Sequence, residues 1–462
     1  MLATKDDWRE ASRITELAVN LVQTVAPHQL SQHDQQHLLD ITSGIATLAA
    51  SFALEARETL LHVVRLLELG RGIITGLRSG LRSDVSELKE RHPRITERFE
   101  KLRDILDSPI EGLPDIEGEG GSLGSGSKKV DRHQASFDLD DTIRQIRLLP
   151  GFENFPRPPR IEELNSAASQ GPMVIINSSE YRSGAFLIEK IIVRSIRLPD
   201  LHHSDVREKV KMLMSIRSNS VLPQQAEAEM SSMLRWPWDV AVRPILDTLD
   251  FSKPPMNDEW PRVWWIPTGE LSSLPLHAVG NHASSSTDSE IDRVVSSYSP
   301  SVRALLHARR HSGKARHSMT HQALLVSMKT TTGCSKLSVA KREVKKLERI
   351  LPASMAKVKL EQSCSNDVLK GLNECSIFHF AGHGKTDLSD ASKSSLLTND
   401  WKENTLTVEH LINLNLNKTS PWLAYLSACS TSRSHSPDLQ DEAIHLVTTC
   451  QLAGFQHVIG SL

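Results

Sequence analysis

Two stretches in the last quarter of the sequence share one pattern, and they constrain the fold more than any other feature. The first is SIFHFAGHG, which ends at Gly384, and the second is PWLAYLSACST, which ends at Thr431. In each stretch a short apolar run closes in small residues and leads to one reactive side chain, His383 in the first and Cys429 in the second. Runs of this length, rich in aromatic and apolar residues, predict buried strands.

The position of the two reactive side chains predicts a common site. In an open parallel sheet, ligands and chemistry collect beyond the carboxyl ends of the strands. We therefore expect His383 and Cys429 to lie at the mouth of one crevice, provided that their strands are neighbours. An imidazole beside a thiol is the minimal arrangement for a cysteine nucleophile, because the imidazole can hold the thiol as a thiolate. A cysteine after an apolar strand also commonly packs in a core, so the prediction depends on the pair and not on Cys429 alone.

The same pair predicts acyl transfer. Cys429 would attack the scissile carbonyl, and His383 would protonate the leaving amine. The resulting oxyanion needs fixed donors, and the backbone N–H groups of Gly384 and Cys429 are the candidates, since a glycine lets a substrate backbone come close. Asp441 opens a predicted helix, where a carboxylate complements the helix dipole; alternatively it lines a substrate pocket that selects a basic residue.

Composition limits the other functions open to the chain. Basic and acidic residues nearly balance, 54 against 56, which gives no overall field for nucleic acid or for an anionic membrane. The five cysteines are irregularly spaced without a CxxC pair, which argues against a disulfide framework and against a zinc site. No phosphate loop of the GxGxxG or Walker type occurs, and we expect no metal and no cofactor. The amino terminus does not resemble a secretory signal, so the expected compartment is the cytoplasm.

Residues 1–110 have the apolar spacing of helices. Apolar side chains recur three and four apart from Trp8 onward and again from Leu38 onward. Alanines between residues 46 and 53 would let two helices approach closely, and residues 34–69 look like one degenerate tetratricopeptide-type unit without a second copy at a fixed period. We predict a helical region that is the tail of a repeat array and binds a protein partner, with an ordinary helical bundle as the alternative.

A change of composition separates this region from the rest. The segment EGEGGSLGSGS predicts a flexible linker over residues 111–135. From residue 136 short strands alternate with helices, which implies right-handed crossovers and a parallel sheet. The predicted fold class is α/β, a mostly parallel sheet flanked by helices and preceded by the all-α region. Predicted strands include 172–177, 185–188, 263–266, 323–327, 356–360, 377–381, 423–426 and 457–460.

Taken in order, these motifs point to a family. HFAGHG and LSACST, followed by DEAIHL and LAGFQHVIGSL, resemble the CHAT domain, a caspase-like module associated with tetratricopeptide repeats. Upstream segments such as GPMVIINSSEYRSGAFLI and VWWIPTGELSSLPLHAVG agree in order, and the resemblance is closest to fungal proteins that join repeats to this domain. It assigns the CHAT domain to residues 136–462. It also implies a relation to caspases, metacaspases and separase, in which a dyad suffices; His383 matches the family histidine and Cys429 the family nucleophile.

The resemblance leaves two functions open. One is a caspase-like cysteine endopeptidase that acts on a protein or peptide, with the helical region for a partner or for regulation, and without nucleic acid or membrane as a partner. The other is a catalytically silent interaction module that keeps the same fold. The family sequence continues past the position of Leu462 with a tryptophan and an acidic loop, so we expect this domain to be truncated at its carboxyl end and the chain to be a fragment or a shortened product.

Overall fold

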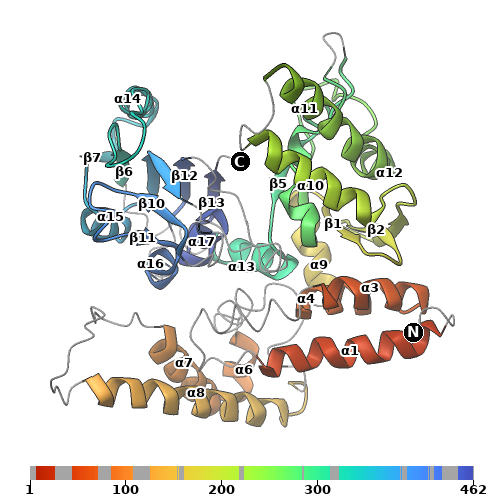
Figure 1. Cartoon of the computed structure of the whole chain (residues 1–462). Helices are drawn as coiled ribbons and strands as arrows, with labels where there is room; N and C mark the ends of the chain where they lie inside the picture. Colours follow the sequence, from red (N-terminus) through yellow and green to blue (C-terminus); the bar gives the residue numbers. More distant parts are fainter. Residues whose placement is uncertain are drawn as a thin grey trace.

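A computed structural model gives the fold of the chain (Figure 1). It describes residues 7–25, 44–70, 85–107, 125–152, 155, 161–217, 223–282, 286–312, 322–385, 387, 393–414, 416, 421–428 and 446–460. Within these residues lie two five-stranded sheets, a small three-stranded sheet and two groups of amino-terminal helices. No helix of this described part is long and apolar enough to cross a membrane.

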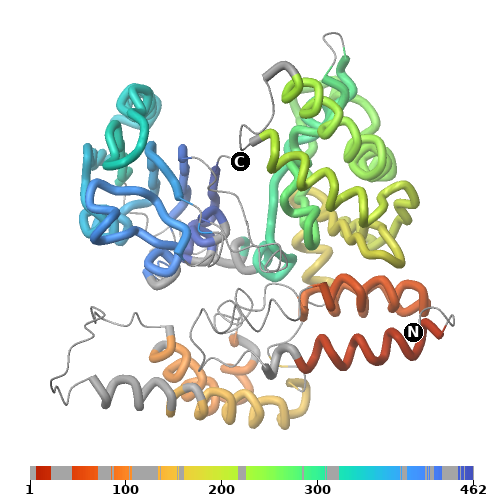
Figure 2. The backbone as a smooth tube through the Cα atoms, in the orientation of Figure 1, coloured from red at the N-terminus to blue at the C-terminus, as the bar shows by residue number. Residues whose placement is uncertain are grey.

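The first helical group packs against the first sheet. It consists of α1 (Trp8–Val25), α3 (Ile45–Glu55) and α4 (Leu60–Gly70). The predicted close approach of helices is confirmed, because the alanines of α3 are almost fully buried, with Ala49 and Ala53 at 0% exposure. The same apolar cluster includes residues of β1 and β2 in the first sheet. In Figure 2 this red segment of the backbone lies beside the yellow segment that holds β1 and β2.

The second helical group has a core of its own. It consists of α6 (Ser86–Arg91), α7 (Pro93–Asp107) and α8 (Ser125–Arg147), with Phe99 and Leu139 fully buried between them. The predicted linker over 111–135 is therefore wrong for residues 125–135, which form the first turns of α8. Leu139 and Ile146 anchor one face of α8 in the core, and the helix extends from this anchor back past residue 135. The rest of that linker lies outside the described residues.

The first sheet is mixed, with the order β3-β2-β1-β4-β5. Strand β1 pairs in parallel with β4, and β4 with β5, whereas β1, β2 and β3 form an antiparallel meander. The strands are β1 (Met173–Ser178), β2 (Ser183–Ile188), β3 (Val193–Arg197), β4 (Arg262–Pro267) and β5 (Val295–Tyr298). Its main helices are α9 (Ile161–Ala167), α10 (His203–Arg217), α11 (Pro223–Pro237), α12 (Arg243–Thr248) and α13 (Val302–Ser312).

The second sheet is wholly parallel, with the order β13-β12-β8-β6-β7. Its strands are β6 (Gln322–Ser327), β7 (Ala356–Glu361), β8 (Ile377–Ala381), β12 (Leu423–Ser427) and β13 (His457–Gly460). The predicted alternation of strands and helices in this part of the chain is confirmed. The sheet appears in shades of blue in Figure 1, with α14 at one end of that unit and α16 and α17 at the other.

Alternation along β8 assigns the two faces of this sheet. Phe378 and Phe380, both at 0% exposure, join the core with α15 (Ser365–Leu372), α16 (Val408–Asn413) and α17 (Leu446–Ala453). Ile377 and Ala381 pack on the opposite face with α14 (Ala340–Ile350). Burying one phenylalanine stabilises the fold by roughly 1.5–3 kcal/mol, so both faces hold β8 firmly in place.

A small antiparallel sheet follows β8. It has the order β11-β10-β9, with β9 (His383–Lys385), β10 (Ser395–Leu397) and β11 (Leu406–Thr407). Gly382 alone separates β9 from β8. His383 is therefore held in a strand and not in a loop, with Leu397 as its register partner.

Candidate active site

The strands that lead to His383 and to Cys429 are neighbours. β8 and β12 pair in parallel along their whole length, from Ile377 beside Leu423 to Ala381 beside Ser427. The ladder continues one residue further, because the Gly382 amide donates to the Ser427 carbonyl at 3.2 Å. The prediction that the strands before His383 and Cys429 are neighbours is thus confirmed. Cys429 itself lies outside the described residues, which end on this side at Ala428, so its role stays a prediction.

His383 is oriented by a backbone carbonyl. Its Nε2 lies 2.7 Å from the carbonyl oxygen of Ser335, in the segment that follows β6. A carbonyl only accepts hydrogen bonds, so Nε2 carries a proton, and Nδ1 of the neutral ring is the acceptor. That tautomer leaves Nδ1 able to take a proton from a thiol. The sequence did not reveal which group orients His383. That group is a backbone carbonyl, which every residue has, so no residue type marks it.

Gly382 and Gly384, which flank His383, differ in the space around them and in the element they belong to. A Cβ on Gly382 would lie 2.6 Å from the Phe380 ring, so the turn from β8 into β9 has no room for a side chain. Gly384, the predicted oxyanion donor, lies in β9 opposite Leu396. Its role as a donor stays a prediction, and so does the role of Asp441, which lies outside the described residues.

A polar cluster of one buried and three half-buried residues, His379 with Glu343, Tyr425 and Ser427, lies under the carboxyl ends of β8 and β12, on the face covered by α14. His379 is 1% exposed, and its Nδ1 donates to the Tyr425 carbonyl at 3.1 Å. Its Nε2 lies 3.6 Å from Oε1 of Glu343, whose Oε2 accepts from the Ser427 hydroxyl at 3.0 Å. Burial lowers the pKa of His379, while the Glu343 carboxylate raises it in part. His379 thus lies on the face of β8 opposite Phe378 and Phe380, and its polar partners come from β12 and α14.

Among the described cysteines, Cys375 and Cys450 are structural. Cys375 and Cys450 are each 1% exposed, and burial raises the pKa of both thiols to about 12. A thiol with so high a pKa stays protonated at neutral pH and is a poor nucleophile. Both side chains pack in the core of the second sheet. Among the residues that the structure describes, no group of three or more His, Cys, Asp or Glu could hold a metal ion.

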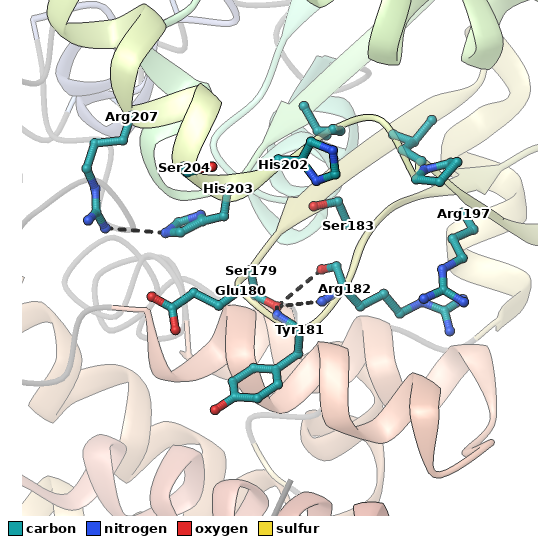
Figure 3. A pocket seen from close by; sticks show the side chains of 13 residues that line it. Ser179, Glu180, Tyr181, Arg182, Ser183, Arg197, His202, His203, Ser204 and Arg207 are labelled. Carbon is teal, nitrogen blue, oxygen red and sulfur yellow. Dashed lines mark hydrogen bonds between the residues drawn. The ribbon is translucent and has the colours of Figure 1, made fainter. Parts of the chain in front are cut away.

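A separate cavity of about 530 Å³ lies between the β1–β2 turn and the start of α10 (Figure 3). Arg182, Arg197 and Arg207 line it, together with two histidines and one glutamate. Glu55 binds Arg182 at 2.9 Å, and Glu270 lies 3.4 Å from Arg207. Two of the three arginines therefore face carboxylates of the protein itself, and neither His383 nor Gly384 lines this cavity.

Comparison with known protein families identifies the family to which the chain belongs. The sequence profile of the CHAT domain matches residues 232–462, half of the chain. The chain belongs to the CHAT domain family. Its mixed α/β fold with parallel strands fits the caspase-like CHAT domain, and the matched part includes His383 and both strands β8 and β12. Strands β1 to β3 precede the matched part, although β1 pairs with β4 of the CHAT domain from Met173 beside Trp264 onward. No curated protein matches the chain.

Proposed function

We propose that this CHAT domain protein is a caspase-like cysteine endopeptidase, with Cys429 as nucleophile and His383 as acid and base. One observation carries the proposal. His383 is held by the Ser335 carbonyl in the tautomer that leaves Nδ1 as an acceptor, next to the strand that leads into Cys429. An imidazole needs such an orienting partner to act as a base, and the partner also stabilises the imidazolium that forms.

The reaction follows from this geometry. Nδ1 of His383 takes the thiol proton, and the Cys429 thiolate attacks the scissile carbonyl of a protein or peptide. Backbone N–H groups of Gly384 and Cys429 stabilise the oxyanion. Collapse of the tetrahedral intermediate breaks the C–N bond, and the imidazolium gives its proton to the amine. Water, deprotonated by His383, then hydrolyses the thioester and regenerates the thiol.

A peptide-library assay tests the proposal, with the wild-type chain beside three variants. We expect the wild type and Cys364→Ala, which removes a different half-buried thiol, to cleave, and Cys429→Ala to be inactive. His383→Gln should lower kcat/KM by about 10² to 10⁴, the usual contribution of a general acid and base. Equal background from the wild type and Cys429→Ala would instead support the silent interaction module.

The first helical group is the proposed binding region for a protein partner. Ile14, Leu17 and Leu21 lie three and four apart on α1, so they share one face, and they are 43%, 56% and 63% exposed. Stacked repeats bury such a stripe against a neighbour. We expect Leu17→Glu/Leu21→Glu to lose proteins that co-purify with the wild-type chain while peptide cleavage is unchanged. Recovery of the same proteins with both chains would contradict a binding role for this stripe.

A further inference from the structure

The segment that contains Ser335 forms a loop that is held by hydrogen bonds between its own backbone groups. The Leu337 amide donates to the Lys329 carbonyl at 2.9 Å, and the Cys334 amide donates to the Thr331 carbonyl at 3.0 Å. Gly333 lies in the inner turn at a φ of +80°, the left-handed region that glycine adopts without strain. We call residues 329–337 the histidine loop. Its backbone geometry sets where the Ser335 carbonyl points.

Gln362 holds the start of the histidine loop. The Thr330 amide donates to its Oε1 at 3.1 Å, and its Nε2 donates to the Thr330 carbonyl at 2.6 Å. Its own amide donates to the Ser327 carbonyl at 3.2 Å, beyond the last register pair of β6 and β7. Gln362 has a φ of +53°, which is uncommon for a residue with a side chain and persists where surrounding contacts fix it.

Trp401 holds the middle of the histidine loop. Its indole Nε1 donates to the Thr332 carbonyl at 3.0 Å, and the Lys385 ammonium lies 5.6 Å from its ring centroid. Lys385 and His383 are two residues apart in β9, so they lie on one face of that strand. Trp401 thus links the strand that carries His383 to the loop that orients it.

The residues beside Trp401 fix its position. The Thr405 hydroxyl donates to the Trp401 carbonyl at 2.7 Å. The carboxylate of Asp400 accepts from the Ser365 amide at 2.8 Å at the start of α15, and from the Thr398 hydroxyl at 2.9 Å. Burial alone would raise the pKa of Asp400, but these hydrogen bonds outweigh it and lower the pKa. The indole is therefore presented to the histidine loop by backbone tied to a helix end.

We propose that Trp401 is a positioning residue for His383. Its indole N–H fixes the Thr332 carbonyl, three residues before the carbonyl that sets the tautomer and direction of the imidazole. This inference rests on the proposed peptidase function for its effect on rate, but its effect on the imidazole is independent of catalysis. Misplacement of a catalytic group by about 1 Å can cost about 10² in rate, which is the size of effect expected here.

Trp401→Phe tests the proposal, because it keeps an aromatic ring for Lys385 and removes the N–H donor to the Thr332 carbonyl together with the second ring of the indole. Trp422→Phe is the matched control, since Trp422 precedes β12 and lies edge-on to His457, at the end of the sheet away from His383. We expect Trp401→Phe to lower kcat/KM by about 10- to 100-fold with little change in KM, and to shift the pH profile of the rate. The control should keep wild-type values.

Nitrogen-15 NMR of His383, assigned with the His383→Gln variant, supplies a second readout. We expect the wild-type neutral ring to carry its proton on Nε2, and Trp401→Phe to show a mixture of the two tautomers. If the wild type cleaves no peptide, the peptidase proposal fails, and the NMR comparison still tests the positioning role.

Gln362→Glu is a second test of the proposal that does not depend on the folding of the Trp401 variant. This change keeps Oε1 as an acceptor and nearly the same size, but removes the donor to the Thr330 carbonyl. We expect it to release the histidine loop and to alter the His383 tautomer in the same direction. Wild-type tautomer and wild-type pH profile in every folded variant would overturn the proposal.

Discussion

Nε2 of His379 lies 3.6 Å from Oε1 of Glu343, in the core between the second sheet and α14. The two side chains sit beneath the strand ends that lead to His383 and Cys429. Burial of the imidazole lowers the pKa of His379 below its ordinary 6.5, and the Glu343 carboxylate opposes part of that shift. The neutral form of His379 is therefore favoured in the folded state.

Glu343→Gln removes the opposing charge, so the pKa of His379 should fall further. Because the folded-state pKa is below the unfolded one, the stability that His379 contributes is present above about pH 6.5 and is lost as the pH falls. The variant should lose more unfolding free energy than the wild type between pH 8 and pH 5. NMR titration of His379 and urea unfolding check this. Glu348→Gln, on the exposed side of α14 beside Lys359, is the control and should leave the His379 titration unchanged.

Glu290 predicts a second pH dependence, of opposite sign. It is 1% exposed, and burial raises its pKa to about 7, although hydrogen bonds from Ser296 and Trp265 lower it in part. The folded state thus binds the proton more tightly than the unfolded chain, so this stability is full below pH 4.5 and is lost as the pH rises through 7. The loss is on the order of 3 kcal/mol. Glu290→Gln should flatten it, which urea unfolding at pH 5 and pH 8 measures; an identical pH dependence in both chains would contradict the assignment.

Glu68 joins the first helical group to α13. Its two carboxylate oxygens accept from the Val302 and Arg303 amides, each at 2.9 Å, so a side chain of α4 caps the first turn of α13. Glu68 is only 5% exposed, and Glu68→Ala would leave buried N–H groups without an acceptor. We expect a loss of about 2–3 kcal/mol in the free energy of unfolding, against almost none for the exposed Glu58→Ala. Equal urea midpoints for the two variants would refute the cap.

Gly382 should not tolerate a side chain. A Cβ there would lie 2.6 Å from the ring of Phe380 and 3.1 Å from Cβ of Met328, and both neighbours are fully buried. Gly382→Ala should therefore destabilise the fold by about 1–3 kcal/mol and displace His383, which lowers peptide cleavage. Gly44→Ala is the control: its φ of +80° costs about 1 kcal/mol, but it meets no atom within 4 Å and should keep full activity. Thermal unfolding and cleavage rates separate the two; undiminished activity in Gly382→Ala would show that the turn can adjust.

Local patterns in the sequence determined the elements of the second sheet. The apolar runs before His383 and Cys429 predicted β8 and β12, and the alternation of Phe378, His379 and Phe380 assigned the two faces of β8. These inferences hold because a strand buried on both faces needs apolar side chains at nearly every position. The same logic failed for β3, whose sequence VRSIR is half exposed and charged, since a strand of that kind is stabilised mainly by pairing with its neighbour.

The arrangement of the candidate site was decided by tertiary structure. Some 40 residues separate β8 from β12, and strand order in a parallel sheet is set by crossover connections rather than by local composition. The Ser335 carbonyl contacts His383 directly, whereas Gln362 and Trp401 bind the carbonyls of Thr330 and Thr332 in the histidine loop. These contacts come from three different connections and use backbone groups that every residue possesses. Residue type alone therefore pointed to an imidazole and a thiol, while the tautomer of that imidazole depends on which distant carbonyl the fold places beside it.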